Sequence, residues 1–173
     1  MRLGIISAVI FLFFLIEGTV VQVIGAAAWG LSWIITPRFV LVGIVFIGLY
    51  LGRRKALVYG LLFGLLYDVV YTDVIGVYAF TMGLTGYLAG LCARYFHQSL
   101  LLVTTTILLA TFMNEWIVYG LYHLFHMAEV SLNTLLLQEM VPTVLFNTLF
   151  ALLIFRPMSR MLTAAESKKN QLA

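Results

Sequence analysis

The chain has 173 residues, of which 63% are hydrophobic and 10% are charged, and its mean hydropathy is +1.07. No soluble domain of this length can bury so much apolar surface, so these values exclude a soluble globular protein. The formal net charge is +3, but the cations lie beside apolar runs, so the expected counter-charge is an anionic membrane surface and not a nucleic acid.

Apolar runs of membrane-spanning length follow one another along the chain. A transmembrane helix needs about 20 apolar residues to cross about 30 Å of hydrocarbon. The predicted spans are residues 3–24, 37–52, 56–70, 76–93, 99–122 and 135–155. These runs predict a single all-α membrane domain over residues 1–173, with six transmembrane helices and a polar tail at residues 163–173. Residues 25–36, which carry Trp29 and Trp33, are predicted to lie in the membrane interface.

The first apolar run has an alternative interpretation. Arg2, the run that follows it and the small residues Ala26, Ala27 and Ala28 also resemble a secretory signal peptide with its cleavage site. The run is long for a signal peptide and Glu17 interrupts it late, so a retained span is favoured over a cleaved one.

Positive charges predict the orientation of the spans. Nine of the ten Lys and Arg residues fall into four clusters, and two predicted spans separate each cluster from the next. The clusters are Arg2; Arg53, Arg54 and Lys55; Arg94; and Arg156, Arg160, Lys168 and Lys169. Because positive loops stay in the cytoplasm, the pattern predicts a multi-pass protein of the cytoplasmic membrane with both termini in the cytoplasm.

Acidic residues gather on the opposite side. In this topology six of the seven lie in the outer half of the membrane or outside it, namely Glu17, Asp68, Asp73, Glu115, Glu129 and Glu139. Ionisable groups at membrane depth are costly and usually face a bundle interior or water. The predicted intramembrane polar residues are Glu17, Arg38, Glu115 and Glu139. Arg38 is the only outer cation and is the expected partner of Glu17 or Glu115.

These acidic residues allow two interpretations. They would form an outward-facing polar cavity or a surface for a partner, or they would lie at the headgroup level, where a charge costs little. The headgroup level is favoured for Asp73 and Glu129, whereas both interpretations stay open for the deeper Glu17 and Glu115.

Glycines are predicted to bring helices close together. Three pairs have the spacing small-xxx-small, namely Gly48 and Gly52, Gly60 and Gly64, and Gly86 and Gly90. This spacing lets two helix backbones approach closely. The glycine faces could meet another span of this chain or a separate protein, and packing within the chain is favoured because a compact bundle needs such faces.

No reactive constellation is predicted. The sequence contains no glycine-rich phosphate loop, no GxSxG motif and no HExxH motif. His123, His126 and Glu129 are three residues apart and drift around a helix, whereas a zinc site needs three or four converging ligands. We therefore expect no catalytic residue, no cofactor and no metal, and the chain is predicted not to be an enzyme.

The most specific stretch of the chain runs from Gly60 to Gly90 and reads GLLFGLLYDVVYTDVIGVYAFTMGLTGYLAG. An apolar helix with glycines ends in an aspartate, a short polar turn follows, a glycine opens the next helix, and a Gly-Tyr pair comes later. This order resembles the recurrent pattern of the rod shape-determining protein MreD family. The matching positions are Gly60, Gly64, Leu65, Leu66, Asp68, Gly76, Gly86 and Tyr87. Pro37, a basic loop at residues 53–55, Pro142 and the basic tail match as well, so the resemblance covers nearly the whole chain.

The resemblance implies a non-catalytic scaffold in the elongation machinery that builds lateral peptidoglycan in rod-shaped bacteria. Proteins of this family bind the membrane-anchored MreC and work beside the actin-like MreB, the polymerase RodA and its partner transpeptidase. Their fold looks similar to that of the six-helix S components of energy-coupling-factor transporters. An alternative function is therefore that of a substrate-binding subunit of a vitamin transporter.

The motif residues Gly60, Gly64, Asp68, Gly76, Gly86 and Tyr87 form a candidate partner-docking or structural motif. Asp68 could charge a docking surface at the outer end of its helix, or it could bond to backbone at the start of the next helix and fix the turn. The second role is favoured because Asp68 lies beside a tight linker.

Overall fold

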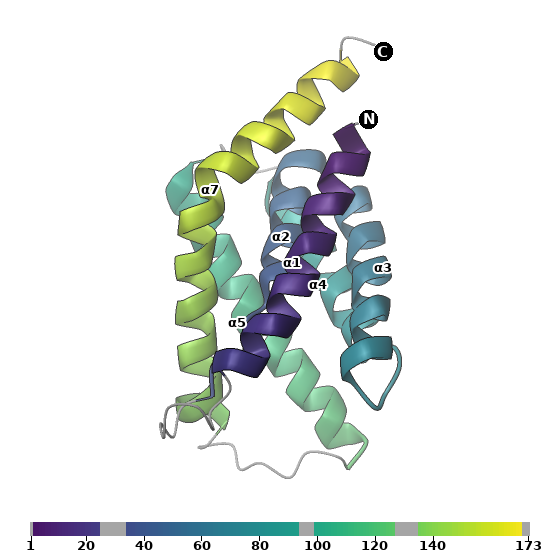
Figure 1. The fold of residues 1–173 in the computed structure, drawn as a ribbon, viewed down its shortest axis with the longest axis vertical. Coiled ribbons are helices and arrows are strands. Elements are labelled where there is room, and N and C mark those ends of the chain that lie inside the picture. Colours follow the sequence, from purple (N-terminus) through teal and green to yellow (C-terminus); the bar gives the residue numbers. More distant parts are fainter. Residues whose placement is uncertain (1, 25–33, 94–98, 127–134, 171–173) are drawn as a thin grey trace.

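The computed structural model describes residues 2–24, 34–93, 99–126 and 135–170, and every regular element within these ranges is helical (Figure 1). The elements are α1 (Arg2–Ile24), α2 (Phe39–Leu51), α3 (Arg53–Tyr71), α4 (Val77–Cys92), α5 (Leu100–Leu124), a π-helical segment η2 (Leu135–Met140) and α7 (Val141–Asn170). The prediction of an all-α fold is confirmed for the described residues. The helices at Leu100–Leu124 and Leu135–Ala165 are long and apolar enough to cross a membrane. Shorter apolar helices lie at Gly4–Val20, Phe39–Leu51 and Val77–Cys92.

The helix boundaries differ from the predicted spans in two places. The sequence predicts residues 53–55 in a loop, but these basic residues form the first turn of α3. Gly52 alone joins α2 to α3, and its φ of 91° lies in the region that favours glycine, so no further loop residue is needed. The predicted polar tail is helical as far as Asn170. Of the predicted interfacial segment, only residues 34–36 are described, and Arg94 and Glu129 also lie outside the described residues.

α7 continues beyond Phe155, where the last predicted span ends. Pro157 lies inside this helix, and an internal proline removes a backbone hydrogen bond and favours a bend. Figure 1 shows the last part of α7 leaning away from its first part, across the end of the bundle where both termini lie. The first turn of α3, with Arg53, Arg54 and Lys55, lies at the same end of the bundle as the termini.

α2 lies at the centre of the bundle. Every residue from Phe39 to Tyr50 is buried, and α1, α3, α4, α5 and α7 all contact this helix. A helix that is apolar on all faces is expected inside a bundle. The rings of Phe39 and Phe150 pack with centroids 4.0 Å apart, and Gly43 leaves room for the side chain of Ile10.

α3 and α4 pack against each other more extensively than any other pair of described helices. A Cβ atom on Gly60 would lie 2.6 Å from the Cα atom of Gly83, and one on Gly64 would collide with the backbone of Tyr78 and Ala79. Small residues allow such close approach of helix backbones. Gly60 and Gly64 therefore pack within the chain, and α4 already fills the groove that they would offer to a partner helix.

Candidate functional site

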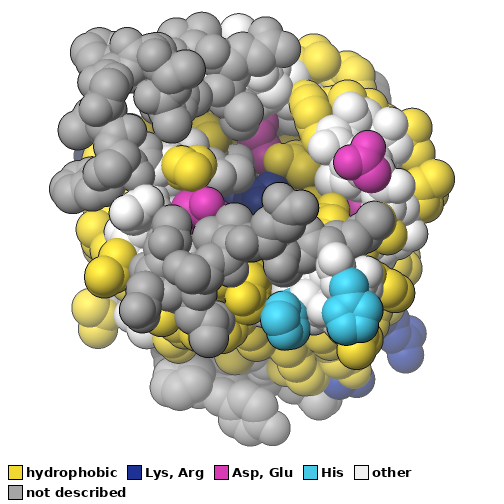
Figure 2. Space-filling view, turned by 90° about the horizontal axis from the view of Figure 1, so that it is seen from below, with side chains coloured by type: hydrophobic (Ala, Val, Ile, Leu, Met, Phe, Trp, Pro, Cys, Tyr) yellow, Lys and Arg dark blue, Asp and Glu magenta, His cyan; other side chains and the backbone are white. Residues whose placement is uncertain are grey.

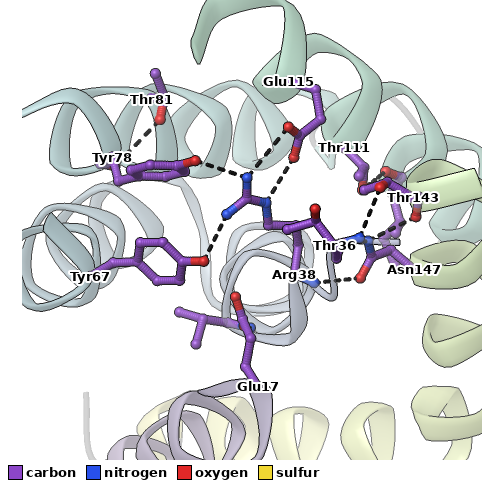
Figure 3. Close-up of polar contacts among 12 residues, drawn as sticks. Glu17, Thr36, Arg38, Tyr67, Tyr78, Thr81, Thr111, Glu115, Thr143 and Asn147 are labelled. Carbon is purple, nitrogen blue, oxygen red and sulfur yellow. Dashed lines mark hydrogen bonds and ion pairs between the residues drawn. The ribbon is translucent and has the colours of Figure 1, made fainter. Parts of the chain in front are cut away.

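The candidate site is a cluster of polar side chains around Arg38, which lies immediately before α2 (Figure 3). Arg38 is only 4% exposed. A buried charge is tolerated only when it is paired and hydrogen-bonded. The contacts of this guanidinium group therefore identify the residues that make up the site.

Glu115, in the middle of α5, is the ionic partner of Arg38. Its Oε1 atom lies 2.8 Å from Arg38 Nε, and its Oε2 atom lies 3.4 Å from Arg38 Nη2. This arrangement approaches the fork geometry in which a guanidinium group and a carboxylate make two parallel bonds. Of the two carboxylates that the sequence offers as partners, the structure pairs Arg38 with Glu115.

Two tyrosines complete the contacts of the guanidinium group. Arg38 Nη1 donates a hydrogen bond to the Tyr67 hydroxyl at 2.9 Å, and Nη2 donates to the Tyr78 hydroxyl at 2.8 Å. The ring centroids of Tyr67 and Tyr78 lie 5.5 Å and 4.8 Å from the guanidinium carbon, a range in which cation–π attraction operates. Arg38 thus ties the start of α2 to α3, α4 and α5.

The backbone around Arg38 is held by α7. The N–H of Arg38 donates to Asn147 Oδ1 at 2.7 Å. Asn147 Nδ2 donates to the carbonyls of Thr36 at 3.1 Å and Thr143 at 2.8 Å, and the Thr36 N–H donates to the Thr143 hydroxyl at 3.1 Å. These bonds satisfy backbone groups that precede a helix and have no partner within it. α7 therefore fixes the direction in which α2 begins.

Asp68 is fully buried near the end of α3 and caps the next helix. Its carboxylate accepts the N–H groups of Gly76 at 2.9 Å, Tyr78 at 2.8 Å and Ala79 at 2.9 Å. The first N–H groups of a helix lack helical partners, and a carboxylate is well suited to accept them. Gly76 has a φ of 107°, which glycine adopts at little cost. Asp68 thus holds the turn between α3 and α4, the role that the sequence favours.

Glu17 reaches the same region from α1. It is 1% exposed, and its Oε2 atom accepts the N–H of Val40 at 3.0 Å, another of the unpaired donors at the start of α2. The Oε1 atom of Glu17 has no hydrogen-bond partner. Glu17 lines a cavity of about 350 Å³, here called the Glu17 cavity. The cavity is lined by Glu17, Gly18, Thr36, Arg38, Tyr67, Tyr71, Thr72 and Tyr78.

Figure 2 shows this end of the bundle, which lies opposite the termini. Acidic side chains in magenta lie on two sides of a basic side chain in dark blue at the bottom of a hollow. The structure thus brings together three of the four predicted intramembrane polar residues, Glu17, Arg38 and Glu115. The fourth, Glu139, is half-buried in η2 and is not among the described residues that contact Arg38.

Two motif residues lie away from this cluster. A Cβ atom on Gly86 would lie 2.6 Å from Ile44 of α2, so Gly86 serves helix packing. The ring centroid of Tyr87 lies 5.6 Å from the guanidinium carbon of Arg53, at the end of the bundle that carries the termini. The motif therefore contains both the hairpin cap at Asp68 and packing positions that do not touch the Arg38 cluster.

The sequence did not predict Tyr67, Tyr78 or Asn147 as site residues. Asn147 carried a usable signal, because it follows Thr143 by four residues in an apolar run, and residues four apart share a helix face. Tyr67 and Tyr78 carried none, because tyrosine is common at both membrane interfaces.

The cluster is largely saturated by its own contacts. Among the described residues, no group of three His, Cys, Asp or Glu side chains could hold a metal ion. Arg38 and Asp68 direct their hydrogen bonds to other parts of the chain. This geometry suits the holding together of helices better than a chemical reaction.

The chain is similar to proteins that determine bacterial cell shape. The family described as rod shape-determining protein MreD matches residues 3–164. A rod shape-determining protein MreD of Bacillus subtilis (strain 168) is 29% identical over 124 residues, which cover 72% of each chain. No solved structure matches the chain. The vitamin-transporter alternative receives no support from these matches and is set aside.

Proposed function

We propose that this chain, which belongs to the rod shape-determining protein MreD family, is a non-catalytic membrane scaffold of the machinery that elongates rod-shaped bacteria. The scaffold binds the membrane-anchored MreC and supports lateral peptidoglycan synthesis. It works in one complex with the actin-like MreB, the polymerase RodA and the transpeptidase partner of RodA. Family membership supports the role in cell shape, and the resemblance of the motif residues supports these partners.

The observation that carries the scaffold role is the set of contacts around Arg38. The guanidinium group of Arg38 bonds to side chains of α3, α4 and α5, and the backbone N–H of Arg38 bonds to α7. In a membrane, polar contacts between helices give the bundle a defined arrangement. A rigid bundle with its charges paired internally can present a fixed outer surface to partner helices, which is what a scaffold requires.

We place the bundle in the cytoplasmic membrane with six crossings and both termini in the cytoplasm, in an arrangement like that of S components. Two helices have the length and hydropathy of membrane spans, and the shorter apolar helices pack beside them. The basic first turn of α3 lies at the same end as both termini, whereas Arg38 pairs with a carboxylate at the other end. This distribution follows the rule that positive segments stay in the cytoplasm.

Affinity purification from a rod-shaped host tests the proposed partners. A C-terminally tagged copy replaces the native gene, the membranes are solubilised gently, and co-purifying proteins are identified by mass spectrometry. We expect an MreC-like protein together with RodA, its transpeptidase partner and MreB. Recovery of the tagged protein in good yield without an MreC-like protein would contradict direct binding.

A complementation assay with matched glycine variants links this binding to the fold. Cells depleted of the native protein should lose their rod shape, and the wild-type chain should restore their width. Gly64→Leu should fail to restore it, because the new side chain collides with α4. Gly120→Ala is the control, because nothing lies within 4 Å of a Cβ atom at Gly120. If Gly64→Leu fully restored the cell width, the function would not depend on the close packing of α3 against α4.

A further inference from the structure

The Glu17 cavity has a hydrogen-bond acceptor that no residue satisfies. Glu17 is 1% exposed, one of its oxygens accepts the Val40 N–H, and the other, Oε1, has no partner. The Tyr67 hydroxyl acts as a donor toward this carboxyl group, but no hydrogen bond of ordinary length and angle reaches Oε1. Figure 3 shows the carboxyl group of Glu17 pointing toward the space between Tyr67 and Arg38. A buried carboxylate oxygen without a hydrogen-bond donor is costly. We therefore expect a group that enters the cavity to donate a hydrogen bond to this atom.

The charges around the cavity favour a cation. Arg38 is the only described cation that lines it, and its charge is already paired with Glu115. Its nitrogens also donate to Tyr67 and Tyr78. An anionic ligand would therefore meet a neutralised guanidinium group and a free carboxylate oxygen. A cation would be attracted to Glu17, which forms no ion pair among the described residues and feels the charge of Arg38 only from a greater distance.

The walls of the cavity suit a small organic cation. The ring of Tyr67 packs between Tyr71 and Tyr78, with centroids 4.8 Å and 4.7 Å away. The Tyr71 hydroxyl lies so close to Gly18 that a Cβ atom there would collide with it, so this ring lies beside the α1 turn that carries Glu17. Aromatic faces attract cations, including ammonium groups. A volume of about 350 Å³ also falls within the range of small-molecule pockets.

We propose that the Glu17 cavity binds a primary ammonium group, which donates a hydrogen bond to Glu17 Oε1 and lies beside the ring of Tyr71. The group belongs to the headgroup of an aminophospholipid or to a free small amine, since both present the same chemistry. This binding goes beyond the scaffold function, and either proposal can fail without the other.

The test uses the full chain in lipid nanodiscs and two probes. The first probe is ethylammonium chloride, titrated against sodium chloride at equal ionic strength, with the melting temperature as the readout. The second is phosphatidylethanolamine mixed with phosphatidylglycerol, with retained lipid measured by native mass spectrometry. We expect ethylammonium to raise the melting temperature more than sodium does, or phosphatidylethanolamine to be retained in excess of its share of the membrane.

Glu17→Gln removes the charge and places an amide group at the acceptor, and it should weaken ammonium binding about tenfold or more. Glu139→Gln is the matched control, because Glu139 lies outside the cavity, and it should bind as the wild type does. If Glu17→Gln does not fold, Tyr71→Leu replaces it, and the loss of the ring should also weaken binding.

Four outcomes decide the proposal. Excess phosphatidylethanolamine that disappears in Glu17→Gln identifies a lipid headgroup as the ligand. A response to ethylammonium without lipid enrichment identifies a free amine. Equal responses of the wild type to ethylammonium and sodium, with no excess lipid, would overturn the proposal, and so would a Glu17→Gln variant that binds as tightly as the wild type.

Discussion

Arg38 Nε lies 2.8 Å from Glu115 Oε1, which joins the start of the central helix to the middle of α5 across 77 residues of sequence. Both side chains are largely buried, with exposed fractions of 5% and 15%. Removing one member of such a pair leaves the other charge without compensation, whereas removing both can be nearly neutral. The pair therefore contributes to stability in a way that single and double variants can separate.

Glu115→Ala should lower the free energy of unfolding by about 3–5 kcal/mol, because it leaves the Arg38 guanidinium buried without a counter-charge. The double variant Arg38→Met with Glu115→Leu should lose less than Glu115→Ala alone, because no charge remains to be buried. Reversible unfolding in mixed detergent micelles measures both values. A double variant less stable than Glu115→Ala would show that the pair is not the source of the effect.

Asp68→Asn should destabilise the hairpin between α3 and α4. The amide keeps one acceptor oxygen but turns an NH₂ group toward backbone N–H donors, so at least one of the N–H groups of Gly76, Tyr78 and Ala79 loses its partner. The expected cost is about 1–3 kcal/mol for each buried donor that is left unpaired. Hydrogen exchange at the Tyr78 and Ala79 amides should accelerate in this variant.

The exposed Asp73 provides the matched control for this substitution, since it lies in the same turn. Asp73→Asn should change stability by no more than about 0.5 kcal/mol, as is usual for exposed positions. If the two variants lowered stability equally, the net charge of the turn and not the cap at Asp68 would be responsible.

Gly64→Ala should destabilise the chain by about 1–3 kcal/mol, because even one methyl group collides with the backbone of α4 at Tyr78 and Ala79. Gly120→Ala should be neutral or slightly stabilising, because the added methyl meets nothing and alanine is the better helix former. Thermal unfolding of the two variants, purified in the same detergent, measures the contrast. Equal melting temperatures would contradict the close packing of α3 on α4.

The fold was predictable where local chemistry decides it. Apolar runs predicted the helices because a span requires a minimum length of apolar side chains, and the position of Asp68 before a tight turn predicted its capping role. The predicted start of α3 was wrong because the apolar run begins only at residue 56, whereas the helix begins three residues earlier, where its backbone hydrogen bonds start. The positive φ of Gly52 allows α3 to begin at Arg53 without a loop.

The site was predictable only in part. Arg38 stood out because it is the only cation on the outer side of the membrane in the predicted topology. A charge at this depth needs a partner of opposite charge, so its partner was expected to be a carboxylate. The choice between Glu17 and Glu115 depends on how α1 and α5 approach α2, which no local pattern encodes. Tyr67 and Tyr78 were missed for the same reason, because their hydroxyl groups meet Arg38 only when α3 and α4 are packed beside it.

Asn114 and Asn147 offer a final contrast, because both are fully buried and only one is hydrogen-bonded. Asn147 holds the Arg38 N–H and the Thr36 carbonyl, so Asn147→Leu should cost about 1–3 kcal/mol for each group that it leaves unpaired. Neither side-chain polar atom of Asn114 has a partner, so Asn114→Leu should be neutral or stabilising, because it removes an unsatisfied amide from the interior. Unfolding of the two variants in the same micelles measures the difference, and a larger loss at Asn114 than at Asn147 would contradict these assigned contacts.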